Sequence, residues 1–240
     1  MKRASHYLRI GFVLLLLIPF RLSAQQPTNP DQTSIITFMG DINTVSVGQL
    51  IAIVNNQIRG GVHKIRIVLS SGGGDTSAAF AAYNYLRSAP AEITTFNIGN
   101  VDSAAVILYC AGKYRYSFPA TRFLIHGNSL NISGTVTMDA AALQGNLELL
   151  KNLNQMVVQV VSSTVNKERQ GEIDNAVRGQ VILTPEEGIK WGLVHEIKAT
   201  FMEPGAVLVS VSGAPSTEVK PPIQFTSTTA EVTSQNKTKH

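Results

Sequence analysis

The sequence predicts an α/β fold with a mostly parallel sheet, and two observations support this prediction. Apolar residues make up 44% of the 240 residues and charged residues 15%, which is enough for one real core and too little for a polytopic membrane protein. Short apolar runs of strand length alternate with segments of helical spacing. Strands that alternate with helices at these intervals need crossover connections, which join parallel strands.

The first half of the chain carries this alternation most clearly. Leu50, Ile51, Val54 and Ile58 have helical spacing, and two glycines at positions 60 and 61 end that helix. Strands are expected at residues 35–40, 64–69, 93–98, 113–118 and 121–126, and helices at residues 45–58, 76–88 and 104–111. The repeated unit is therefore of the βαβ or β-β-α type.

The longest helix is expected from Met138 to about Val165, and it carries two apolar stripes. The first stripe is Leu143, Leu147, Leu150, Val157 and Val161, and the second is Leu149, Leu153, Met156 and Val160. This width exceeds what a surface helix needs. The helix is either buried on two sides within the monomer, or its second stripe packs on another subunit. A capping box at Thr184 then opens a short helix over residues 186–192, and a strand follows at 193–197.

The basic residues of the chain are concentrated in its leader. Lysine and arginine number 20 against 16 acidic residues, but four of the 20 lie within residues 1–24, which contain no acid. The remainder is neutral, so nucleic acid is not expected as a partner. The leader has a charged start and an apolar run of eleven residues, Ile10–Phe20. A membrane-spanning helix needs about 20 residues, so residues 1–24 indicate a cleavable signal peptide and a periplasmic or secreted protein.

The remaining domain boundaries follow from composition. Residues 25–33 form a polar lead-in, residues 34–203 a single α/β domain, and residues 204–240 a Ser/Thr-rich tail. The tail is expected to be disordered beyond a strand at residues 206–211. The single cysteine, Cys110, cannot form an intramolecular disulfide or a structural metal site, and its apolar setting indicates a buried thiol. No cofactor is expected.

Three features are suited to acyl transfer, which needs a nucleophile, a base and oxyanion donors. Ser103 lies between a strand and an apolar helix, where it is either a plain helix cap or a nucleophile. Three glycines at positions 72–74 let bare backbone approach a ligand, and no Walker A lysine follows them. His126 ends a strand. These residues all follow strands of one parallel sheet, at the edge where ligand sites form.

Four ordered motifs carry a resemblance to a known family. They are Ser-Gly-Gly-Gly at 71–74, Gly-x-x-x-Ser at 99–103, Arg-x-x-Ile-His at 122–126, and Pro-Glu at 185–186 followed by Trp-Gly-Leu-Val at 191–194. Residues 35–197 resemble ClpP, the proteolytic subunit of the caseinolytic serine protease, whose fold is shared with the crotonases. The resemblance implies that Ser103 is the nucleophile and His126 the general base. It also implies that the backbone N–H groups of Gly74 and Ala104 form the oxyanion hole.

The chain departs from the ClpP pattern at the third triad position, where the family's Asp falls on Gly179. Glycine has no side chain to orient an imidazole. Asp174 and Asn175 lie about one helical turn earlier and are the candidate substitutes, of which Asp174 is taken as the third member. The export signal is a second departure, because ClpP is fed by a cytoplasmic ATP-driven unfoldase. An exported relative is expected to work without an ATPase partner, on peptides or unfolded proteins. The resemblance also implies a homo-oligomer, for which a ring is one arrangement.

The resulting hypothesis is an exported serine endopeptidase that cleaves unfolded or short peptides through a Ser-His acyl-enzyme mechanism. One alternative is a catalytically impaired relative that binds peptides or scaffolds an assembly, for which the loss at Gly179 is the sign. A second alternative is an acyl-CoA enzyme of crotonase type, in which Ser103 and His126 would be incidental.

Overall fold

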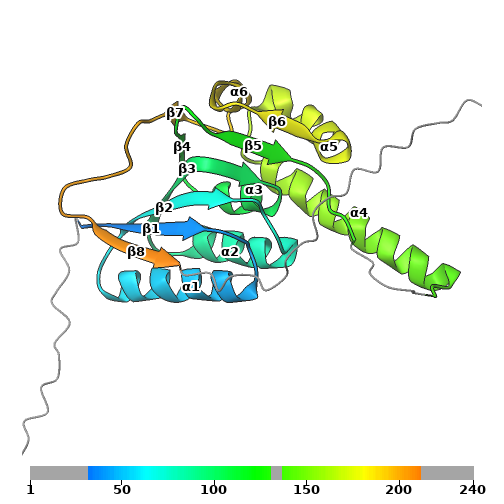
Figure 1. Cartoon of the computed structure of the whole chain (residues 1–240), viewed down its shortest axis with the longest axis horizontal. Coiled ribbons are helices and arrows are strands. Elements are labelled where there is room, and N and C mark those ends of the chain that lie inside the picture. The colour runs from blue at the N-terminus through cyan, green and yellow to red at the C-terminus, as the bar shows by residue number, and fades with distance from the viewer. Residues whose placement is uncertain (1–31, 131–136, 212–240) are drawn as a thin grey trace, which may run out of the picture.

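An eight-stranded sheet runs through the computed structural model, which describes residues 32–130 and 137–211 of the chain. Its main path has the order β6-β5-β3-β2-β1-β8, with β4 paired to β3 and β7 paired to β4 (Figure 1). All pairs are parallel except β5 with β6. The α/β fold with a mostly parallel sheet is therefore confirmed.

The strands are β1 (Thr33–Met39), β2 (Lys64–Ser71), β3 (Glu92–Asp102), β4 (Tyr114–Ser117), β5 (Arg122–Ile125), β6 (Val181–Leu183), β7 (Glu196–Ile197) and β8 (Val207–Val211). The helices are α1 (Thr44–Arg59), α2 (Thr76–Ser88), α3 (Ala104–Tyr109), α4 (Ala140–Ser162), α5 (Gln170–Gly179) and α6 (Pro185–Trp191), with a short 3₁₀ turn at Lys167–Arg169. The capping box expected at Thr184 opens α6, where Thr184 and Glu187 exchange both capping hydrogen bonds.

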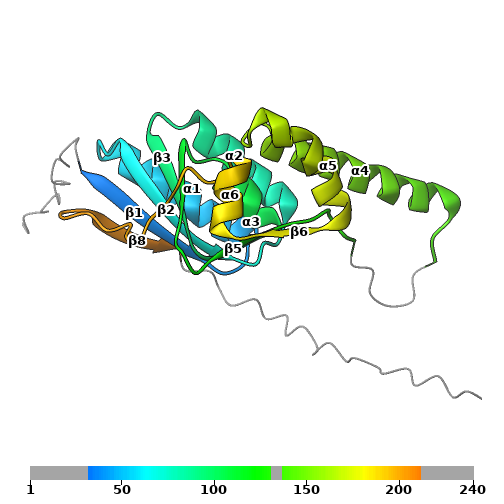
Figure 2. The same cartoon turned by 90° about the horizontal axis from the view of Figure 1, so that it is seen from above.

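The two faces of the sheet bury different side chains, as the alternation along each strand requires. Ile36, Ile67 and Leu69 lie in the main core, on the face covered by α1, α2 and α3 (Figure 2). Ile35, Val68 and Phe96 form a smaller cluster on the other face, against which Phe201 packs. The strands are thus apolar on both faces, which is typical of parallel sheets.

The buried groups near α3 include Cys110 and the guanidinium of Arg115. Burial raises the pKa of the Cys110 thiol to about 11, so the thiol stays protonated at neutral pH. Arg115 donates to the carbonyl oxygens of Leu193, Gly112 and Gly192 at 2.8 to 3.1 Å. The bonds to Leu193 and Gly192 attach β4 to the segment that follows α6. Within the described ranges, no helix is both long enough and apolar enough to cross a membrane.

Two parts of the fold differ from the sequence prediction. Helix α5 and strand β6 occupy a stretch for which no element was expected. Strand β8 lies where the sequence predicts a strand, at residues 206–211, and it pairs with β1 in parallel, so residues beyond 203 contribute to the sheet. The segment forms a strand because Val207, Val209 and Val211 alternate with polar or exposed residues, which is the pattern of a half-buried strand. The leader at 1–24 and the tail beyond 211 lie outside the described residues.

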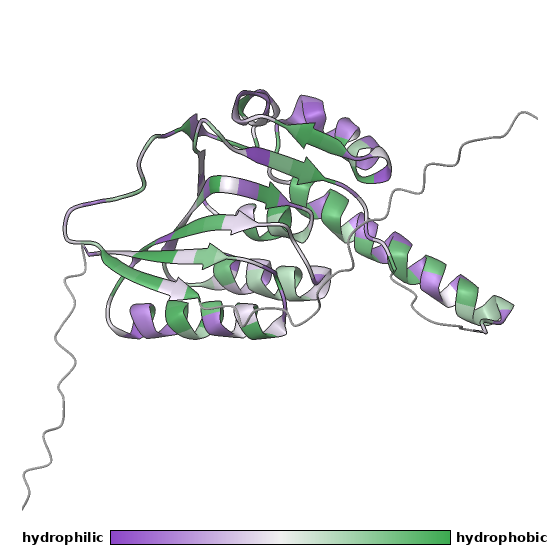
Figure 3. Cartoon of the chain, in the orientation of Figure 1, coloured by the Kyte–Doolittle hydropathy of each residue, from purple (hydrophilic) through white to green (hydrophobic). Residues whose placement is uncertain are grey.

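Helix α4 is only partly covered by the monomer. Its second half packs on the core through Leu153, Val157 and Val161. Its first half extends beyond the sheet, where apolar positions continue along the helix (Figure 3). Leu147 and Leu149 there are 46% and 49% exposed. The alternative that α4 is buried on two sides within the monomer is therefore wrong for this half of the helix.

Candidate active site

Ser103 occupies the turn between β3 and α3 in a backbone conformation that L-residues rarely adopt. Its φ and ψ are 57° and −126°, and its N–H donates to the Leu124 carbonyl oxygen at 2.7 Å. Its side chain makes no capping hydrogen bond to α3. A plain helix cap has extended backbone and bonds the first turn, so that interpretation of Ser103 is wrong. A strained serine on a turn from strand to helix is instead typical of a nucleophile.

The glycine turn after β2 lies directly against Ser103. Gly73 has φ of +96°, and a Cβ built on it would lie 2.7 Å from the Ser103 Cβ and 3.0 Å from the Ala104 nitrogen. Gly74 has φ of +139°, and a Cβ there would overlap the Ile42 carbonyl oxygen. The turn therefore needs glycine at both positions, since a side chain at 73 would fill the space beside the serine.

Two backbone N–H groups near Ser103 have no partner in the described part of the chain. The Gly73 N–H is engaged, because it donates to the Ser71 Oγ at 3.1 Å. The N–H groups of Gly74 and Ala104 make no hydrogen bond to another described residue. These are the two groups that the ClpP resemblance assigns to the oxyanion hole, and both are free to donate to a substrate oxygen.

His126 follows β5, which is paired in parallel with β3, so His126 and Ser103 follow neighbouring strand ends. The half-buried imidazole places its Nδ1 atom 2.6 Å from the Gly127 carbonyl oxygen. Because a carbonyl oxygen can only accept, Nδ1 carries the proton in this contact and Nε2 has a free lone pair. Ser103 and His126 are not hydrogen-bonded to each other here, a bond that often forms only when substrate binds.

Asp102, the residue before Ser103, is bonded to side chains other than His126. Its Oδ2 atom accepts from Arg122 at 2.8 Å and from Asn100 at 3.0 Å. The hydrogen bond to Asp102 raises the pKa of Arg122 above its ordinary value. This carboxylate therefore serves an ion pair with β5 and does not act on the imidazole.

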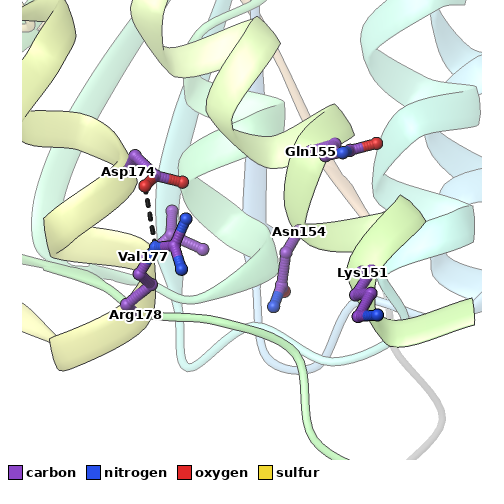
Figure 4. A pocket seen from close by; sticks show the side chains of 6 residues that line it. All are labelled: Lys151, Asn154, Gln155, Asp174, Val177 and Arg178. Atoms are coloured by element: carbon purple, nitrogen blue, oxygen red, sulfur yellow. Dashed lines mark hydrogen bonds and ion pairs between the residues drawn. The ribbon is translucent and has the colours of Figure 1, made fainter. Parts of the chain in front are cut away.

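The candidate third catalytic residue, Asp174, does not orient His126 in this structure. Asp174 lies on α5 and pairs with Arg178 one turn later, with 2.7 Å between Oδ2 and Nε (Figure 4). Both residues line a pocket between α4 and α5 that does not include His126. Gly179 does line the pocket of His126, and the residues that line this pocket include no carboxylate.

Sequence reasoning missed three polar residues that connect the parts of this site. The Thr76 hydroxyl at the start of α2 donates to the Asn128 Oδ1. The Asn128 backbone N–H and its Nδ2 donate to the Asn154 Oδ1 at 2.7 and 2.9 Å. The chain Thr76–Asn128–Asn154 thus ties the glycine turn, the segment after His126 and α4 together. The sequence signal that could have indicated this hydrogen-bonded chain is the polar Asn154 beside the apolar Leu153 of α4.

A comparison with known protein families decides the family of this chain. A model of the family described as Clp protease matches residues 30–200. The chain belongs to the Clp protease family. Proteolytic subunit 2 of the ATP-dependent Clp protease from Borreliella burgdorferi is 28% identical over 141 residues, which cover 57% of this chain and 67% of the relative. The subunit of the same name from Chlamydia trachomatis serovar D is 29% identical over 144 residues, or 58% and 67% of the two chains.

Membership in the Clp protease family supports a peptidase, and therefore a hydrolase, as the kind of enzyme. The matched range contains the glycine turn, Ser103, His126 and position 179. The described geometry places the glycine turn, Ser103 and His126 at one edge of the sheet, after the ends of β2, β3 and β5.

Proposed function

We propose that this protein is an exported serine endopeptidase that hydrolyses unfolded or short peptides through Ser103 and His126. The observation that carries the proposal is the Ser103 backbone, which is strained at φ 57° and does no capping, beside two N–H groups that have no partner among the described residues. Strain of this kind costs about 1–3 kcal/mol and persists at sites where the geometry is needed.

The proposed reaction uses the groups already described. The Ser103 Oγ attacks the scissile carbonyl carbon while the His126 Nε2 takes the hydroxyl proton. The Gly74 and Ala104 N–H groups donate to the oxyanion that forms. His126 then gives its proton to the leaving amine, and water hydrolyses the acyl-enzyme by the same route. Each step leaves the Nδ1–H of His126 in place.

The exported location and the absence of an ATPase partner belong to the same proposal. They are supported by the leader, whose basic start and short apolar run have the composition of a signal peptide. The names of both relatives describe an ATP-dependent protease. An exported enzyme would meet its substrates without ATP, and so we propose peptides that need no unfolding.

A fluorophosphonate probe tests the catalytic part of the proposal, because such probes react with serines activated as nucleophiles. The purified protein is expected to be labelled at Ser103, identified by mass spectrometry of the modified peptide, and to cleave small peptide esters. Labelling that is absent, or equally strong in the Ser103→Ala variant, would contradict the proposal.

One observation favours a second candidate, a catalytically impaired protein that binds peptides or scaffolds an assembly. Gly179 leaves the His126 pocket without a carboxylate at the family's third triad position. An impaired relative would bind peptides but neither react with the probe nor hydrolyse esters. The same labelling experiment therefore separates the two candidates. No feature of the described site favours the acyl-CoA alternative.

We further propose that the protein is a homo-oligomer in which the exposed first half of α4 is covered by another subunit. Replacing Leu149, which is 49% exposed, with lysine is expected to lower the oligomer mass seen in sedimentation velocity. Burying an unpaired charge in an apolar contact costs several kcal/mol.

The matched control for this substitution is Gln144→Lys, which adds the same charge at an exposed polar position of the same helix half. It is expected to leave the oligomer intact. A wild-type protein that sediments as a monomer at micromolar concentration would contradict the proposal.

A further inference from the structure

The His126 ring contacts a backbone carbonyl where the ClpP resemblance implies a carboxylate. Its Nδ1 lies 2.6 Å from the Gly127 oxygen, and the residue at position 179 is a glycine that also lines the pocket. We infer that the Gly127–Asn128 peptide unit orients the imidazole in place of the missing Asp, and that Asn154 is the positioning residue that holds this peptide unit. The inference rests on the proposed Ser-His mechanism and names a further member of that site.

The peptide unit between Gly127 and Asn128 is hydrogen-bonded at both ends. The carbonyl of the unit, from Gly127, accepts from His126 Nδ1. The N–H of the same unit, from Asn128, donates to the Asn154 Oδ1 at 2.7 Å. A peptide bond is planar, and cis bonds are absent from the described residues, so its C=O and N–H point in opposite directions. Fixing the N–H with Asn154 therefore fixes the carbonyl toward the ring.

Asn154 is itself well placed for this task. Its Oδ1 accepts a second hydrogen bond from the Asn128 Nδ2 at 2.9 Å, so one oxygen binds both the backbone and the side chain of Asn128. The Thr76 hydroxyl holds the other side of the Asn128 amide. Asn154 lies on the half of α4 that packs against the core, next to Leu153 and Val157. The oxygen that anchors the peptide unit is therefore attached to a rigid element.

Gly127 allows this arrangement because it has no side chain. A Cβ on Gly127 would lie 2.8 Å from the Val177 carbonyl oxygen and 3.2 Å from the Asn154 Nδ2. The peptide unit is thus packed between α4 and α5. Hydrogen bonds in a row also polarise one another, so the bond to Asn154 makes the Gly127 oxygen a better acceptor.

No carboxylate competes for the Nδ1–H of His126 among the described residues that line its pocket. Arg178 is the charged residue of that pocket, and its guanidinium is held by Asp174. The carbonyl is a weaker partner than a carboxylate, since it carries no full charge. It still supplies the tautomer that catalysis needs, with the proton on Nδ1 and the lone pair on Nε2.

The test compares Asn154→Leu with Asn154→Asp and uses two measurements. Leucine has a similar volume and no acceptor, whereas aspartate keeps the acceptor oxygen and is the conservative variant. Gln155→Leu is the control, because Gln155 is the exposed neighbour on α4 and does not line the His126 pocket. The first measurement is ¹⁵N NMR of the histidine rings, with His126 assigned from the His126→Gln variant. The second is kcat and KM for a peptide ester.

The wild-type His126 ring is expected as the Nδ1–H tautomer, and it should remain so in Asn154→Asp and Gln155→Leu. In Asn154→Leu the tautomer is expected to be mixed. The value of kcat should fall between about 10²-fold, the cost of a displaced catalytic group, and about 10⁴-fold, the cost of a wrong tautomer. KM should change little, because Asn154 acts through His126. Adding Gly179→Asp to Asn154→Leu should raise kcat, since position 179 lines the His126 pocket and a Cβ there meets no atom within 4 Å.

The outcomes separate this inference from the proposed function. An Nε2–H tautomer in the wild type overturns the inference, whether or not the protein is active. So does an Asn154→Leu variant with unchanged tautomer and kcat in an enzyme labelled at Ser103, and the proposed function would then stand. A wild type that shows the Nδ1–H tautomer, loses it in Asn154→Leu and reacts with no probe supports the orienting contact and refutes the proposed peptidase.

Discussion

Replacing Ser103 with alanine is expected to remove ester and peptide hydrolysis, because the Ser103 hydroxyl is the proposed nucleophile. The size of the loss is informative. In a serine protease with an oriented histidine, losing the serine costs about 10⁶-fold in kcat, whereas a site that already lacks orientation has only about 10²-fold left to lose. The orienting contact through Gly127 predicts a loss well above about 10²-fold.

Ser103→Gly is the matched variant for this experiment, since it removes the hydroxyl and also relieves the backbone strain at φ 57°. It should be as inactive as Ser103→Ala but raise the free energy of unfolding in urea by about 1 kcal/mol. His126→Ala combined with Ser103→Ala should cost no more than either change alone, because the two residues act as a unit. Hydrolysis by Ser103→Ala at the wild-type rate would show that another nucleophile is used.

The sequence predicted the elements whose apolar pattern is long and regular. Strands β1, β2 and β3 and helices α1, α2 and α4 fall where periodicity placed them, within a few residues at each end. Helix α5 was missed because its apolar residues are only Ile173, Ala176 and Val177 in an otherwise polar stretch. Strand β6 has three residues, which is too short for a pattern to show.

The sequence predicted those residues of the candidate site that directly follow a strand. Ser103 and His126 both follow strands of a parallel sheet, and such strands end at one edge. The sequence does not show which way the Asp174 side chain points, so it could not show whether Asp174 reaches His126. On α5, Asp174 forms an ion pair with Arg178 at the i,i+4 spacing that favours such pairs. The group that contacts His126 is a backbone oxygen, which carries no sequence signal. Its anchor Asn154 lies 26 residues from Asn128, so only the folded chain brings them together.

Replacing Gly73 with alanine is expected to damage both stability and catalysis. At φ of +96° an L-residue is strained, and its Cβ would lie 2.7 Å from the Ser103 Cβ and 2.8 Å from the Asp102 carbonyl oxygen. Both contacts are closer than packed atoms allow, so the turn or Ser103 must move. We expect the free energy of unfolding in urea to fall by about 2–4 kcal/mol from strain and overpacking together.

The catalytic part of this prediction is separable because the neighbouring glycine provides a control. A methyl group on Gly73 would also lie 3.0 Å from the Ala104 nitrogen, in the space where an oxyanion would approach, so kcat should fall about 10²–10³-fold, the usual cost of one lost oxyanion donor. Gly72 has ordinary φ, and a Cβ there meets nothing within 4 Å. Gly72→Ala should therefore change the free energy of unfolding by no more than about 0.5 kcal/mol and leave kcat near the wild-type value. If the two alanine variants behave alike, the glycine turn does not lie against Ser103, and the oxyanion hole must be built from other groups.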